Sequence, residues 1–414
     1  MSDWKAKMKK AATFEFPYQY EMIFCLLCVF SAVMFRPDVR FLKPHNVYLY
    51  FMNYFKDGFL AKGLIGTIVT TFFEKMTEKQ FYILYGCVLV LVFGLLLYFL
   101  GEVVRIRKKE NELFMVYLGS VLCFAPCSIT MFTSLEIFGS QEIFLVGFFL
   151  VSMFLLIKGK GCGAIFPISI LAVLIDERYV FTYLPVVLIC LLYQVKTHQI
   201  KTGSKKKRMS LLYLTGGCSY VLAAVLRFFT KSREKDAVQF YKTLMTRAGF
   251  DIAADSDSVK KALSAVICDY FVGIKDWFSY RSMTRTDYEI FGISLLLCVP
   301  VILFLAYIWV LFVKNSRHKK YAVLFPLSIL LLVPLFIFGS DYGWNLFHLL
   351  FTSFIAVFSL TGMKDPAMIA ALDTVKEKFQ RRQWLFWILP VYLLLIGDID
   401  GQGMTIAYLI RELL

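Results

Sequence analysis

The chain has 414 residues, of which 59% are hydrophobic and 18% charged, and its formal net charge is +15. So high a hydrophobic fraction excludes an ordinary soluble domain and predicts an all-α, polytopic membrane protein. Membrane proteins concentrate lysine and arginine in their cytoplasmic loops. The positive net charge is therefore expected from membrane topology and gives no separate support for nucleic-acid binding.

The N-terminal segment MSDWKAKMKK is basic and precedes an apolar stretch at about 20–35 that has no small-residue cleavage site. We interpret this stretch as an uncleaved first helix and not as a signal peptide. A first outer loop at 36–80 follows, with a re-entrant or amphipathic helix. The second span, at about 81–101, ends in the basic sequence RIRKKE.

The rest of the chain alternates between apolar segments and polar loops, which gives a helical bundle of about 11 spans. The further segments lie at about 113–131, 143–157, two shorter stretches on either side of residues 176–178, 209–228, 290–313, 322–339, 345–362 and 384–397. Loops assigned to the inner side, such as KNSRHKK, are basic, whereas TSLEIFGSQE and FGSDYGWN contain no lysine or arginine. This asymmetry predicts a cytoplasmic N-terminus and an outer C-terminus.

Residues 1–414 are expected to form a single integral membrane domain with two further extramembrane parts. In the large outer loop (229–289), apolar residues recur at helical spacing from Val259 to Tyr270. In 364–383, Asp365-Pro366 can begin a helix with an apolar face that includes Leu372 and Val375. We expect this second helix to be cytoplasmic, with that face on the anionic inner leaflet.

The first outer loop contains the aromatic and glycine-rich stretch 48–73, in which Asp57 and Lys62 lie five residues apart. The stretch after Asp57 is shorter than the ~20 residues that cross a hydrocarbon core. Two interpretations remain open: an interfacial helix that only packs, or the floor of a site at the membrane surface.

Asp176, Glu177 and Arg178 lie between two short apolar segments, so three charges would sit near the ends of two short helices. Each buried charge costs roughly 2.5–3.5 kcal/mol on insertion scales, a cost that pairing or a wet cavity offsets. The alternative is a tight helical hairpin whose turn merely reaches water, with Arg178 paired to a neighbouring acid.

Other candidate residues lie on the same predicted outer side. Glu136 and Glu142 flank a short turn, Asp341 precedes the tenth span, His348 lies within that span, and Arg40 begins the first outer loop. Lysine and arginine at headgroup level suit a lipid phosphate or diphosphate, and a neighbouring carboxylate can act as general base for a hydroxyl. The chemistry that these residue types suit is the transfer of a group from a phosphate-activated lipid donor.

Four short sequences carry a resemblance to a known group of proteins: DGFLAKGLIG, FGSQEIF, IDERYVFTYLP and GSDYGWN. In this layout the chain resembles polytopic bacterial membrane proteins of surface-polysaccharide biosynthesis, which are similar to polymerase-like and GT-C-type glycosyltransferases. The resemblance implies a multi-pass protein of the bacterial cytoplasmic membrane. Its partners would be a polyprenyl-linked sugar donor, a glycan acceptor, membrane lipids and other polysaccharide-assembly proteins.

By the same resemblance, Asp57, Glu177 and Asp341 are the catalytic candidates, with Asp57 first as base. The substrate-binding candidates are Lys62, Arg178, Arg40, Glu136, Glu142, Asp176 and His348. No cofactor is expected; a divalent cation among the acids stays open, although no ligand spacing requires one.

Two other classes of protein remain open. A transporter or flippase of lipid-linked sugars would also place polar groups inside a helical bundle. A non-catalytic membrane partner subunit would have the same topology and need no site.

Overall fold

The computed structural model describes residues 17–34, 44–73, 75–133, 137–197, 202–231, 237–250, 285–332, 342–399 and 404–414. Within these residues every regular element is a helix, apart from one isolated antiparallel bridge between Ile399 and Met404. Four helical stretches are long and apolar enough to cross a membrane: Glu78–Arg107, Lys205–Phe229, Tyr288–Asn315 and Tyr342–Gly362. The fold is therefore all-α, and its apolar helices indicate a membrane-embedded protein.

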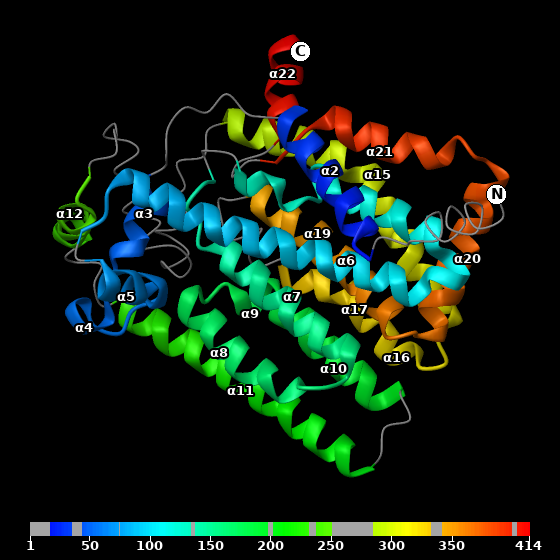
Figure 1. Ribbon diagram of the computed structural model, residues 1–414, viewed down its shortest axis with the longest axis horizontal. Helices are drawn as coiled ribbons and strands as arrows, with labels where there is room; N and C mark the ends of the chain where they lie inside the picture. The colour runs from blue at the N-terminus through cyan, green and yellow to red at the C-terminus, as the bar shows by residue number, and fades with distance from the viewer. Residues whose placement is uncertain are drawn as a thin grey trace, which may run out of the picture.

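The predicted apolar segments correspond to the main helices of the bundle (Figure 1). These are α2 (Gln19–Met34), α6 (Glu78–Cys123), α7 (Glu142–Lys158), α8 (Ile165–Ile175), α10 (Leu184–Thr197), α11 (Thr202–Lys231), α15 (Arg285–Asn315), α19 (Tyr342–Gly362) and α21 (Leu385–Ile396). In the described part of the predicted apolar stretch at 322–339, which ends at residue 332, the chain forms the short helices α16 (Lys319–Ala322), α17 (Leu324–Leu327) and η5 (Ser328–Leu332).

Helix α6 covers both the second and the third predicted spans, but it does not run straight. The carboxyl group of Glu21 on α2 lies against Gly101, and Phe24, about one turn later, lies against Gly119. A straight helix would place these two glycines about 27 Å apart. One turn of α2 cannot reach both, so α6 folds back between them, which agrees with two predicted spans joined at RIRKKE.

The described part of the predicted first outer loop folds into several short elements. They are α3 (Pro44–Tyr48), η1 (Leu49–Phe51), α4 (Tyr54–Asp57) and α5 (Gly63–Phe72). Asn53 caps α4 by accepting hydrogen bonds from the backbone N–H groups of Phe55 and Lys56. Gly66 allows α5 to lie directly on η1, because a Cβ at this position would overlap the carbonyl oxygen of Met52.

The segment predicted to be the large outer loop contributes α12 (Ala237–Ala248), which packs on η1 and α3. The backbone N–H of Met76 donates to the carbonyl of Ala248 at 3.4 Å. The helix predicted from Val259 to Tyr270 lies outside the described residues. Helices α3, α4, α5 and α12 gather at one end of the molecule, and α16 and α20 lie at the other (Figure 1).

The amphipathic helix predicted at 364–383 is present as α20 (Pro366–Arg381). Asp365 caps it, accepting from the backbone N–H groups of Ala367 and Met368. Its apolar residues, including Leu372 and Val375, are buried, and α20 packs against α15. The apolar face therefore contacts the protein interior, and the expectation that it lies on a lipid leaflet is wrong.

Helix α19 is the central helix of the bundle. Nearly all of its side chains are buried, and it contacts α6, α7, α10 and α15. It is consequently the element that can present side chains to more than one interior site. The last helix, α22 (Thr405–Leu413), packs on the first turns of α15, where Arg411 Nε lies 3.0 Å from Glu289 Oε2.

Replacing Gly66 by alanine should destabilise the folded protein by about 1–3 kcal/mol, because the added methyl group must displace a backbone oxygen. Gly86→Ala in α6 is the matched control, since nothing lies within 4 Å of a Cβ there. Thermal unfolding of the detergent-purified variants measures the difference. Equal midpoints for the two variants would contradict the packing of α5 on η1.

Candidate functional site

Asp176 is the centre of a buried ionic network. Its side chain is 1% exposed and accepts from Arg178 Nε at 2.9 Å and from Arg178 Nη2 at 2.7 Å. The backbone N–H of Arg178 also donates to it, at 2.9 Å. On its other side, Lys62 Nζ lies 3.9 Å from Asp176 Oδ2. One carboxylate therefore holds two cations that come from distant parts of the chain.

The network continues from Arg178 through Glu142 to His348. Arg178 Nη2 lies 3.2 Å from Glu142 Oε2, and His348 Nε2 lies 3.4 Å from Glu142 Oε1. Glu142 and His348 are both buried. The ring of Tyr183 packs edge-on against the imidazole, with 5.1 Å between the ring centroids. The structure thus brings five predicted site residues from four separate segments into one cluster.

Local sequence places each of these groups. Helix α8 ends at Ile175, so Asp176 follows in extended conformation and turns the chain toward the short helix α9 (Tyr179–Thr182). Glu142 begins α7, where a negative charge is favoured by the helix dipole. Lys62 precedes α5 with a positive φ of 64°, which is uncommon for a residue with a side chain.

Several buried polar atoms near these residues have no hydrogen-bond partner among the described residues. They include Oε2 of Glu177, Nδ1 of His348 and both polar atoms of the Gln141 side chain. Buried polar groups are normally hydrogen-bonded, and each exception calls for an explanation. Buried polar atoms without hydrogen-bond partners beside an ionic network are expected in a site that binds a polar ligand.

The adjacent acids Asp176 and Glu177 differ in their electrostatics. Burial alone would raise the pKa of Asp176, but Arg178 and Lys62 outweigh it and lower this pKa to about 2. The pKa of Glu177 is raised, first by burial and then by the charge of Asp176, against the opposing charges of Lys62 and Arg227. Neighbouring acids whose pKa values are pushed apart can take different roles, one as a fixed charge and the other as a proton acceptor.

Asp57 belongs to a second ion pair, with Arg247 of α12. Arg247 Nη1 lies 2.5 Å from Asp57 Oδ2 and Nη2 lies 2.7 Å from Oδ1, a bidentate arrangement. The backbone N–H of Asn53 donates to the same carboxylate at 2.8 Å, and Arg247 also donates to the carbonyl of Phe51 at 3.3 Å. Both oxygens of Asp57 are therefore engaged, and the pair fastens α12 to the first outer loop.

Arg247 is a partner of the predicted site residue Asp57 that sequence reasoning missed. It lies in a basic, polar stretch without a motif, 190 residues from Asp57. No local pattern indicates so distant a partner. Its only sequence signal is its position on α12, a helix with a polar and an apolar face.

Three predicted site residues, Asp341, Arg40 and Glu136, lie outside the described residues. Within the described part of the chain, no group of three or more His, Cys, Asp or Glu side chains is arranged to hold a metal ion.

These observations define a helical, membrane-embedded protein with a buried charged cluster at one end. Comparison of the chain with models of known protein families, with curated proteins and with solved structures finds no match.

A double-mutant cycle on Asp57 and Arg247 should give a coupling energy of about 0.5–3 kcal/mol. Asp57→Asn and Arg247→Gln should each lower stability, because each leaves a largely buried partner unpaired. The double variant should be less destabilised than the sum of the two. Thermal unfolding in detergent measures the four proteins, and strictly additive effects would show that the pair does not form.

Proposed function

We propose that the protein is a membrane glycosyltransferase or polysaccharide polymerase that acts on polyprenyl-phosphate-linked sugars at the outer face of the bacterial cytoplasmic membrane. The observation that carries the proposal is the buried cluster of Lys62, Asp176, Arg178, Glu142 and His348. The proposal includes about 11 spans, a cytoplasmic N-terminus and an outer C-terminus, so that this cluster lies near the outer headgroups.

In this proposal, Lys62 and Arg178 bind the phosphate groups of the donor. A guanidinium group can hold two phosphate oxygens at once, and an ammonium group adds a compact positive charge. Asp176 keeps both cations within reach of one point even when no donor is bound. The role of Asp176 is to position these cations, because its own charge would repel a phosphate.

Glu177 is the proposed general base. Its unpartnered oxygen can accept a proton from a sugar hydroxyl, and its raised pKa strengthens it as a proton acceptor. The hydroxyl oxygen then attacks the anomeric carbon, and the bond from that carbon to the donor's phosphate oxygen breaks. The departing phosphate keeps the electron pair, and Lys62 and Arg178 stabilise its charge.

The remaining polar groups would orient the sugars. Glu142 and His348 are both buried, and the imidazole Nδ1 and the side chain of Gln141 have free hydrogen-bonding capacity among the described residues. Hydroxyl groups of a sugar can supply both donors and acceptors to such a set. Asp57 takes a structural role in this proposal, because Arg247 and Asn53 occupy its carboxylate.

Glu177→Gln should lower polymer formation by about 10²–10⁴-fold, because the amide cannot accept the proton. Glu78→Gln, at an exposed acid in the first turn of α6, is the matched control and should leave polymer formation unchanged. The measurement is surface polysaccharide and lipid-linked intermediate in cells, with the abundance of each variant in the membrane checked.

If Glu177→Gln cells make as much polymer as Glu78→Gln cells while deletion of the whole chain abolishes it, the catalytic proposal fails. That outcome would favour a non-catalytic membrane partner. Accumulation of lipid-linked intermediate only on the inner leaflet would favour a transporter.

A further inference from the structure

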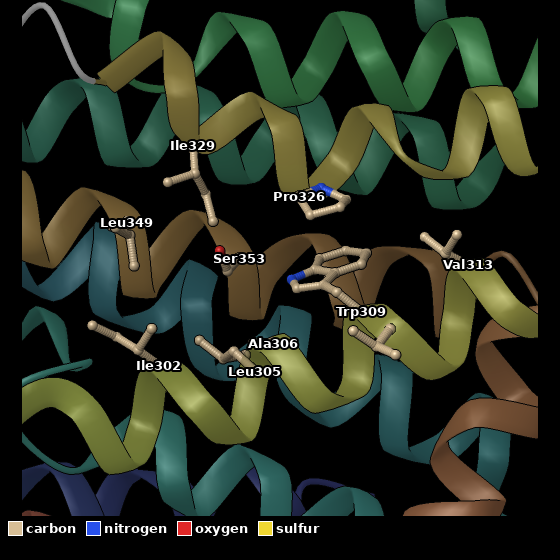
Figure 2. Close-up of a pocket in the computed structure, with 10 residues that line it drawn as sticks. Ile302, Leu305, Ala306, Trp309, Val313, Pro326, Ile329, Leu349 and Ser353 are labelled. Carbon is tan, nitrogen blue, oxygen red and sulfur yellow. The ribbon is translucent and has the colours of Figure 1, made fainter.

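An apolar pocket of about 310 Å³ lies between α15, the α17–η5 segment and α19, apart from the charged cluster (Figure 2). Leu349 and Ser353 line it from α19. His348, the neighbour of Leu349, faces Glu142 instead, because adjacent residues of a helix point in directions about 100° apart. The pocket and the charged cluster therefore use different faces of the same central helix.

The pocket opens on the surface that would meet lipid. Val310 lines it and is 63% exposed. Leu303, Leu327 and Leu330 are exposed large apolar side chains on the same helices. Along α15 the lining runs from Ile302 to Val313, about 16 Å. An elongated apolar slot that opens sideways to the bilayer has the shape for a hydrocarbon chain.

One polar group of the pocket has no hydrogen-bond partner within the described part of the chain. This group is the buried indole Nε1 of Trp309, whose side chain is 3% exposed. In Figure 2 the ring lies in the pocket with its nitrogen turned toward Ser353. A buried tryptophan N–H usually donates to an acceptor. A pure hydrocarbon offers none, whereas the ester carbonyl of a diacyl lipid does.

Positive charges lie just beyond one end of the pocket. Lys314 follows Val313 and, four residues after Val310, shares its helix face. Arg317, Lys319 and Lys320 follow and are exposed. The sequence from 310 to 332 contains no aspartate or glutamate. Lys314 is about 7 Å along the helix axis from Trp309. At this spacing the ammonium group can contact the phosphate of a lipid while the indole N–H donates to an ester carbonyl of the same lipid.

We propose that this pocket binds one anionic diacyl phospholipid from the leaflet on the side of the basic loop 314–320. One acyl chain lies along α15, the ester carbonyl accepts a hydrogen bond from Trp309, and the phosphate lies beside Lys314 and Arg317. This lipid would fill the space between α15 and the α17–η5 segment. The inference does not depend on the proposed glycosyl transfer.

Full-length protein in detergent, supplied with phosphatidylglycerol or phosphatidylcholine, tests the proposal by native mass spectrometry. The parent should retain one phosphatidylglycerol molecule in preference to phosphatidylcholine. Ala306→Phe places a ring in the pocket from its lipid-facing side and should lower the retained fraction at least tenfold. Leu303→Phe adds a ring at an exposed position nearby and should retain lipid like the parent.

Two further variants separate the contacts. Trp309→Phe keeps the ring and removes the N–H, so it should weaken retention of both lipids. Lys314→Gln with Arg317→Gln should remove the preference for phosphatidylglycerol. These substitutions keep the proposal testable even if Ala306→Phe fails to fold, which thermal unfolding will reveal.

The proposal is overturned if the parent retains no phospholipid, or if Ala306→Phe and Leu303→Phe retain equal fractions. Equal retention of the two lipids by the parent would reject an anionic headgroup site. A retained mass that matches a polyprenyl lipid, or a second copy of the chain seated on this face, would reject the proposed occupant.

Discussion

The carboxylate of Asp176, held between Arg178 and Lys62, is the interaction on which the charged end of the molecule depends. Burying ions costs several kcal/mol each, and good geometry with complementary charges is needed to offset this cost. Here Asp176, which is nearly fully buried, pairs with Lys62 and Arg178, and Arg178 also pairs with Glu142. The turn after α8, the start of α5, the start of α7 and α19 are thereby fixed relative to one another.

The central helix α19 links this charged end to the apolar remainder of the bundle. One of its faces supplies His348 to the ionic cluster, and another supplies Leu349 and Ser353 to the pocket beside α15. The segment 44–73 supplies Lys62 to the charged end, and the pair of Asp57 and Arg247 fastens α12 to this segment. Two ion pairs made over long sequence distances thus organise an end of the protein that apolar packing alone would not specify.

Much of this arrangement follows from patterns that are local in the sequence. Most of the apolar helices, the cap at Asp365 and the turn at Asp176 are each set by neighbouring residues, and the structure has them where the sequence predicts them; the stretch from 322 is an exception, since its described part forms short helices. Arg178 pairs with the neighbouring acid Asp176, as one interpretation of the sequence expects, and also with a second acid, Glu142. Asp176 is buried, however, so this turn does not merely reach water as that interpretation requires. The candidates drawn from the predicted outer side include five residues that the fold brings together: Lys62, Glu142, Asp176, Arg178 and His348.

The rest depends on contacts between distant segments, which no local pattern encodes. The contact between Arg247 and Asp57 depends on the packing of α12 on η1. The apolar face of α20 is buried because α20 packs against α15, a contact that the sequence of α20 alone does not indicate. Likewise, the difference between the pKa values of Asp176 and Glu177 depends on the positions of Arg178, Lys62 and Arg227 in the fold. Adjacent acids look equivalent in the sequence and become different in the fold.

Binding of a polyprenyl phosphate to the purified protein tests the central claim most directly, namely that Lys62 and Arg178 form one phosphate site. Titration calorimetry in detergent should show saturable binding to the parent. Lys62→Gln and Arg178→Gln should each weaken it at least tenfold, while Lys75→Gln, at an exposed lysine within the same segment 36–80 as Lys62, should not. Equal affinity for all four proteins, or no saturable binding to the parent, would contradict the account.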